Sequence, residues 1–118
     1  MAKGNPPSLT PAAFQVLLAL AGGAAHGYGI MSFVNELTGG SPQLGPGTLY
    51  RTLGRLSSDG LVEEVRHETD GEPADSRRRY YRLTGLGRNA AAREAELLAR
   101  LASAAEAAGL LSRRERTA

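Results

Sequence analysis

The segment from Pro46 to Asp59 constrains the fold more than any other, because its side chains divide between two opposed faces of a helix. Leu49, Leu53 and Leu56 recur at i, i+4 and i+7, which places them on one face. Proline suits the first position of such a helix. The opposite face is small, polar or cationic and carries Gly47, Thr48, Arg51, Arg55 and Ser58. We therefore predict a helix that buries its leucines and presents two arginines to solvent.

Two further helices are predicted before this segment. A threonine cap, Thr10, followed by Pro11 marks the start of the first, which should end at Gly22–Gly23. The second should run from Gly27 to Leu37, and a brief strand is expected at Gln43–Leu44. The apolar side of the second helix is predicted to consist of Tyr28, Ile30, Met31, Val34 and Leu37.

A hairpin and a long helix are predicted after Gly60. The strands should span Leu61–His67 and Arg77–Leu83, joined by the polar segment Glu68–Ser76. The final helix should run from Thr84 to Ala108, with a stripe of apolar residues whose later spacing is that of a coiled-coil seam. A helix of this length exceeds what a three-helix core can cover, so the stripe predicts a homodimer. The expected dimerisation residues are Ala90, Leu97, Leu101, Ala104 and Ala108.

Composition excludes several classes of protein. The chain of 118 residues suits one domain, and the absence of cysteine rules out disulfides and thiolate metal sites. No apolar stretch reaches the roughly 18 residues of a membrane helix, and no signal peptide precedes the first helix, so we expect a cytoplasmic protein. No nucleophile motif, phosphate loop, cofactor motif or metal signature is present, so we expect neither an enzyme nor a metal or cofactor.

The order helix, helix, turn, helix, hairpin, long helix predicts a mainly α fold with a small β-hairpin. It is the order of a winged helix-turn-helix extended by a long C-terminal dimerisation helix. We expect a flexible tail at residues 1–8, the winged domain at 9–83, the dimerisation helix at 84–111 and a second flexible tail at 112–118.

The cationic helix face suits double-stranded DNA, because the major groove admits one α-helix and an arginine can bind a guanine edge with two hydrogen bonds. Arg51 and Arg55 lie one turn apart, and Thr48 lies near the start of the same helix. In the hairpin, Arg77, Arg78 and Arg79 could neutralise phosphates or enter a minor groove. Both sets could instead form ordinary solvated faces. A winged-helix protein–protein adaptor without DNA binding is the alternative, but it would not need these arginines on one side.

Six ordered motifs resemble the PadR family of bacterial transcriptional regulators. The resemblance implies a dimeric winged-helix repressor that binds a palindromic promoter site and, in some members, is released by a small molecule. It also implies that Tyr28 and Tyr50 lie near the DNA backbone. The motifs are Leu9-Thr10-Pro11, His26-Gly27-Tyr28, Gly47-Thr48-Leu49-Tyr50, Leu53-Gly54-Arg55-Leu56, Asp59-Gly60-Leu61-Val62 and Tyr80-Tyr81-Arg82-Leu83-Thr84.

The chain departs from the pattern in two places. The segment between the strands is unusually acidic, and the last helix lacks the tryptophan with which some short members sandwich flat drugs. If a small hydrophobic or phenolic effector binds, the residues expected to line its site are Phe14, Tyr81, Leu97 and Leu101. His26 is expected to satisfy a helix end, with a pH-responsive or ligand-binding role left as the alternative.

Overall fold

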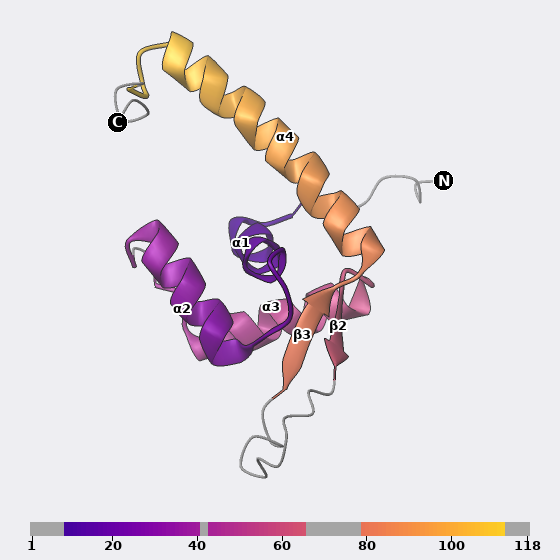
Figure 1. The fold of residues 1–118 in the computed structure, drawn as a ribbon. Helices are drawn as coiled ribbons and strands as arrows, with labels where there is room; N and C mark the ends of the chain where they lie inside the picture. The colour runs from indigo at the N-terminus through magenta and orange to yellow at the C-terminus, as the bar shows by residue number, and fades with distance from the viewer. Residues whose placement is uncertain (1–8, 41–42, 66–78, 113–118) are drawn as a thin grey trace.

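The computed structural model describes residues 9–40, 43–65 and 79–112. The elements follow the predicted order, with one additional short strand (Figure 1). They are α1 (Pro11–Leu20), β1 (Ala25–His26), α2 (Gly27–Thr38), α3 (Pro46–Ser58), β2 (Val62–Val65), β3 (Tyr80–Leu83) and α4 (Gly85–Ala107). The predicted fold class, mainly α with a small hairpin and a long C-terminal helix, is confirmed.

The helix boundaries follow local signals in the sequence. The Thr10 hydroxyl accepts a hydrogen bond from the Ala13 N–H at 3.0 Å and caps α1. Thr84 caps α4 in the same way through the Gly87 N–H, also at 3.0 Å. Helix α2 ends at Gly39, whose φ of 76° is a left-handed conformation that glycine adopts without a steric penalty. The two threonine caps satisfy N–H groups that have no partner within the helix.

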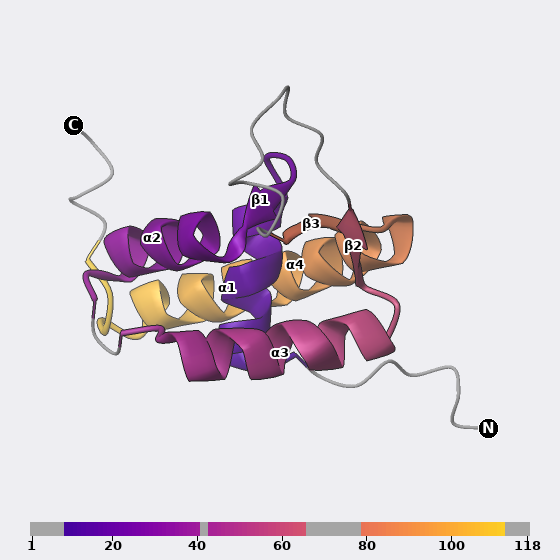
Figure 2. The same ribbon diagram turned by 90° about the horizontal axis from the view of Figure 1, so that it is seen from below.

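The core lies where α1, α2 and α3 meet, and α1 runs between the other two helices when the molecule is seen from below (Figure 2). The predicted leucine face of α3 is buried, with Leu49, Leu53 and Leu56 at most 2% exposed. They pack with Val16, Leu17, Leu20, Ile30 and Val34 in one apolar cluster. Burial of this face fixes the orientation of α3 and directs its polar face to solvent.

The apolar side predicted for α2 is partly wrong. Ile30 and Val34 are buried and Met31 packs against the core, but Tyr28 and Leu37 are 73% and 58% exposed. Their positions lie at the edges of the helix stripe, where neighbouring elements do not reach. Tyr28 is therefore a surface residue at the start of α2.

The sheet contains a strand that the sequence did not reveal. The order is β1-β3-β2, all antiparallel, with His26 opposite Tyr80 and Ala25 opposite Tyr81. A strand of two residues is too short to show an alternating pattern, so only its pairing with β3 defines it. The strand predicted at Gln43–Leu44 is wrong: the Asn35 side chain, rather than another strand, bonds both backbone groups of Leu44.

Helix α4 begins against the domain and then leaves it (Figure 1). Its first turns pack on α1 and β3, and Ala90 and Ala91 contact the core cluster. Farther along, Leu97, Leu98 and Leu101 are 40% to 56% exposed. Ala90 thus packs, half-buried, against its own domain, and its place in a dimer interface stays a prediction. None of the described helices is long and apolar enough to cross a membrane.

Candidate nucleic-acid interface

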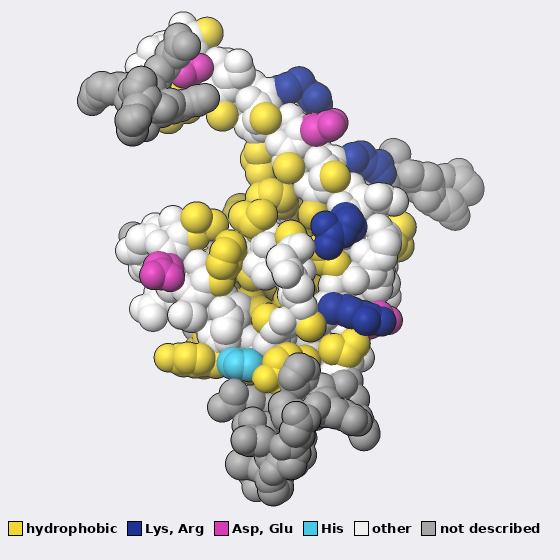
Figure 3. All heavy atoms as spheres, in the orientation of Figure 1, with side chains coloured by type: hydrophobic (Ala, Val, Ile, Leu, Met, Phe, Trp, Pro, Cys, Tyr) yellow, Lys and Arg dark blue, Asp and Glu magenta, His cyan; other side chains and the backbone are white. Residues whose placement is uncertain are grey.

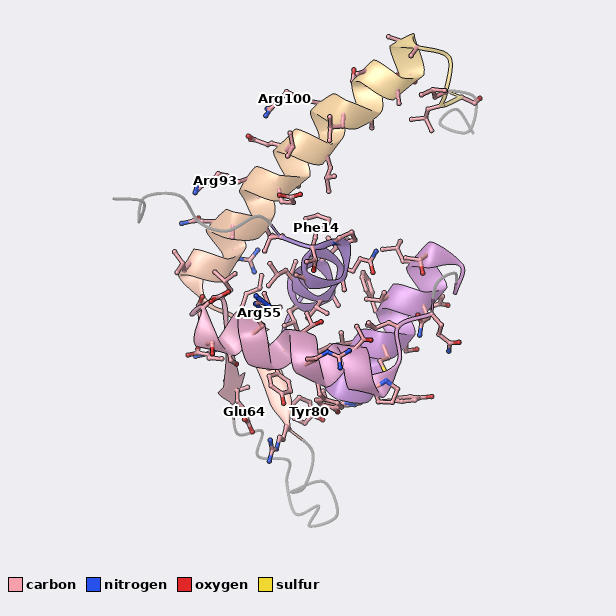
Figure 4. The ribbon with its side chains drawn as sticks, turned by 180° about the vertical axis from the view of Figure 1, so that it is seen from behind. Phe14, Arg55, Glu64, Tyr80, Arg93 and Arg100 are labelled. Atoms are coloured by element: carbon pink, nitrogen blue, oxygen red, sulfur yellow. The ribbon has the colours of Figure 1, made fainter. Side chains whose placement is uncertain are left out.

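The outer face of α3 carries positive charge that no described neighbour neutralises. Thr48, Arg51 and Arg55 are all exposed, as predicted. Within the described ranges, neither arginine forms a salt bridge or a side-chain hydrogen bond. Figure 4 shows Arg55 at one edge of α3, with Tyr80 and Glu64 beyond the opposite edge. The face therefore offers two free guanidinium groups, a turn apart, to an anionic partner.

Asn35 sets the turn that leads into α3. Its amide oxygen accepts from the Leu44 N–H at 2.7 Å, and its amide nitrogen donates to the Leu44 carbonyl at 3.2 Å. The next residue, Gly45, is the N-cap of α3 and has no side chain to cap the helix. No pattern in the sequence points to Asn35, because its bonds to Leu44 span nine residues.

The base of the hairpin is less cationic than its sequence suggests. Arg82 pairs with Glu63 at 2.7 Å and Arg79 pairs with Glu64 at 3.6 Å. The four side chains are about half exposed or more, so each pair stabilises the fold by at most about 1 kcal/mol and can be exchanged for a phosphate. Arg77, Arg78 and the acidic segment Glu68–Ser76 lie outside the described residues.

Tyr81, two residues after Arg79, faces the core. Burial, followed by the negative charge of Glu64, raises the pKa of its phenol above 10.0, while a hydrogen bond from Arg79 opposes the change. Because the ring is only 5% exposed, it cannot line an open ligand site in this conformation. The expectation that Tyr81 lines an effector site is therefore not met.

Tyr50 and Tyr28 lie on either side of the first residue of α2. The Tyr50 ring covers Gly27 so closely that a Cβ there would lie 2.9 Å from Tyr50 Cζ and nearer still to Oη. Tyr50 remains 49% exposed, and Tyr28 is more exposed still. Both phenols therefore lie at the N-terminus of α2, and a side chain at position 27 would force the end of the Tyr50 ring to shift.

His26 joins α2 to the sheet. Its Nδ1 accepts a hydrogen bond from the Gly29 N–H at 3.2 Å, which makes it the N-cap of α2 and confirms its predicted place at a helix end. Its ring stacks on Tyr28 at 6.4 Å between centroids and meets Tyr80 edge-on at 5.2 Å. No pattern in the sequence predicts this role for Tyr80, because its contact with His26 depends on the pairing of β1 with β3.

Hydrogen bonds between Gly60, Leu61 and Thr84 hold the end of α3 to the start of α4, and we call this connection the joint. The Thr84 hydroxyl donates to the Gly60 carbonyl at 2.7 Å, and the Thr84 N–H donates to the Leu61 carbonyl at 3.1 Å. Gly87 is buried directly against the Leu61 backbone. The joint therefore fixes the angle between α3 and α4.

The surface is hollowed between the outer part of α4 and the α1–α2 pair, with hydrophobic side chains along both walls (Figure 3). Arg93 and Arg100 lie along the outer edge of α4, away from this hollow (Figure 4). Of the expected effector residues, Phe14 is half-buried, whereas Leu97 and Leu101 are exposed. The apolar face of α4 is thus open to a partner.

Comparison with known proteins agrees with this arrangement. The Transcriptional regulator PadR-like family matches residues 16–93. A transcriptional regulator of Mycobacterium tuberculosis is 40% identical over 67 residues, which are 57% of this chain and 59% of that protein. An uncharacterized protein in a transposon of Streptomyces fradiae is 40% identical over 86 residues, 73% of this chain and 22% of its own length. The chain thus spans less than two thirds of either relative.

A solved structure supports the fold. A transcriptional regulator from Clostridium thermocellum superposes with a TM-score of 0.66 at 22% identity, over 80% of this chain and 86% of that one. The family match covers well over half of the sequence and includes α2, α3, the hairpin and the start of α4. The chain therefore belongs to the PadR-like family of transcriptional regulators.

Proposed function

We propose that this chain is a dimeric, sequence-specific DNA-binding regulator that represses transcription from a palindromic operator. The observation that carries the proposal is the pair of unneutralised arginines, Arg51 and Arg55, on the exposed face of α3. Each can bind guanine O6 and N7 in the major groove, an interaction worth about 1–3 kcal/mol of discrimination against the wrong base. Thr48, nearer the start of the helix, would contact a base edge or a thymine methyl group.

Contacts to the DNA backbone would come from both sides of α3. Tyr28 and Tyr50 flank the N-terminus of α2 and would donate hydroxyl hydrogen bonds to phosphate oxygens. On the hairpin side of α3, Arg79 would leave its surface ion pair with Glu64 and bind a phosphate instead. Arg77 and Arg78 would bind phosphates beside it. These contacts would set the position of α3 in the groove without reading the sequence.

The dimer is inferred from the apolar face of α4. The side of the helix that begins against its own domain continues outward as Leu97, Leu98 and Leu101, and then as Ala104 and Ala108. Three leucines about half exposed on one helix face are costly in water, and pairing with a second α4 would bury them. The small residues would permit close approach of the two helices. Residues 84–111 would thus form the dimerisation helix and residues 9–83 the DNA-binding domain.

A two-fold dimer matches a palindrome, because each α3 serves one half-site. The half-site centres would lie about 34 Å apart, one turn of DNA. Bound at a promoter, such a dimer would exclude the transcription machinery, which is the basis of the repressor role. The hollow between α4 and the α1–α2 pair would hold a small hydrophobic effector that changes the angle between the two DNA-binding domains of the dimer and releases the DNA, and we expect Phe14, Leu97 and Leu101 to line it.

The test is DNA affinity as a function of salt. Fragments selected from genomic DNA would be labelled, and binding followed by fluorescence anisotropy between 50 and 200 mM salt. A dimer that contacts about six to ten phosphates should lose about 10³–10⁵ in affinity across that range. A flat salt response, or no preference for any selected fragment over random DNA, would contradict the proposal. Calorimetric titration with phenolic compounds would then test for an effector, whose binding should lower operator affinity.

A further inference from the structure

We propose that His26 is a positioning residue for DNA binding, and that acidification weakens operator binding because the first turn of α2 depends on a neutral Nδ1. The inference rests on the proposed DNA-binding function and adds a proton-sensitive element to it. It is carried by one hydrogen bond and two ring contacts, all made by the same side chain.

The hydrogen bond fixes the protonation state of one ring nitrogen. A backbone N–H can only donate, so Nδ1 of His26 must accept the bond from the Gly29 N–H. A proton on Nδ1 removes this acceptor and leaves one of the first N–H groups of α2 without its cap. It also places a positive charge at the positive end of the helix dipole. Both effects disfavour the present geometry of the first turn.

That turn carries the groups proposed to contact DNA. Tyr28 is its second residue, is largely exposed and stacks on the His26 ring. Gly27 lies directly beneath the Tyr50 phenol, so a shift of the turn also moves Tyr50. The edge-on contact with Tyr80 holds the same ring against β3. His26 therefore keeps phenols from α2 and α3 in fixed positions relative to the sheet.

Among the described residues, the side chains that face the ring are Tyr28 from α2, Tyr80 from β3 and, across Gly27, Tyr50 from α3. None of these phenols ordinarily changes charge between pH 5.5 and 8. The ion pair of Arg82 with Glu63 lies on the same side of the sheet, because Arg82 follows Tyr80 by two residues. Phenols, carboxylates and guanidinium groups keep one charge state over this range, whereas histidine ordinarily titrates within it.

The experiment compares wild type, His26→Asn and His67→Asn on one selected operator fragment from pH 8.0 to 5.5 at constant salt. These are the two histidines of the chain. Asparagine caps a helix without titrating. Wild type and His67→Asn should bind about fivefold more weakly at pH 5.5 than at pH 8.0. Loss of one typical helix-cap interaction changes an equilibrium constant by about this factor. His26→Asn keeps a helix cap but loses both ring contacts, so it should bind more weakly than wild type at pH 8.0, and its affinity should be the same at pH 5.5 as at pH 8.0.

The same weakening in His26→Asn as in wild type would overturn the inference. So would tighter binding of wild type at low pH that His26→Asn abolishes, because His26 would then be a cationic phosphate ligand. If wild type binds no operator at pH 8.0, the proposed function itself fails. A second measurement needs no variant: in ¹⁵N-labelled wild-type protein without DNA, the Gly29 amide resonance should titrate between pH 8 and 5.5. A Gly29 resonance that does not move would also overturn the inference.

Discussion

Replacing Gly87 with alanine tests the joint between the proposed recognition helix α3 and the proposed dimerisation helix α4. A Cβ at this position would lie 2.8 Å from the carbonyl carbon of Leu61 and 3.2 Å from its Cα, and nearer still to its oxygen. The obstacle is backbone rather than the end of a flexible side chain, so the first turn of α4 must move. Overpacking of this kind typically costs about 1–3 kcal/mol.

Gly85→Ala provides a matched control from the same helical turn. No heavy atom outside its immediate neighbours lies within 4 Å of a Cβ at position 85. Alanine there gains up to about 1 kcal/mol of helix propensity without a clash. The two variants add the same methyl group to the same helix, so the gain in helix propensity cancels and the difference in their unfolding free energies, about 1–3 kcal/mol, isolates the close approach to Leu61.

Thermal and urea unfolding, followed by circular dichroism at one protein concentration, would measure the difference. At about 4 °C per kcal/mol for a domain of this size, Gly87→Ala should melt several degrees below wild type and Gly85→Ala at or above it. Gly87→Ala should also alter the preferred spacing between operator half-sites, because the joint sets the angle between the two helices. Equal melting temperatures for the two variants would refute the argument from packing.

Three further predictions concern the interface, the dimer and the turn before α3. Arg51→Ala and Arg55→Ala should each weaken operator binding about 5- to 150-fold while changing affinity for random DNA less, and equal losses on both would make them phosphate contacts. Leu101→Glu should convert a dimer to monomers in sedimentation because it places an unpaired charge in the proposed interface, whereas Arg93→Glu, on the outer edge of α4, should not. Asn35→Ala should lower the free energy of unfolding by about 1–3 kcal/mol, because it leaves both half-buried backbone groups of Leu44 without their partner. An unchanged free energy of unfolding in urea would show that water replaces the amide.

Local sequence signals determined most of the helical framework. Thr10 was identifiable as a cap because the bond it makes joins residues three positions apart, and the predicted start of the last helix, Thr84, is the cap of α4 in the structure. The spacing of Leu49, Leu53 and Leu56 placed the arginines on the exposed face of α3 before any packing was known. Interactions of this kind lie within one or two helical turns, so they are written in consecutive residues.

Tertiary structure alone decided what the remaining functional side chains meet. The pairing of β1 with β3 brings His26 to Tyr80, the crossing of α2 and α3 sets Tyr50 over Gly27, and the hairpin register pairs Arg82 with Glu63. The sequence predicted Tyr28 in the apolar face of α2, but packing left it exposed at the start of that helix. Periodicity tells which residues share a face of an element, whereas contacts between distant segments depend on how those faces are packed against one another.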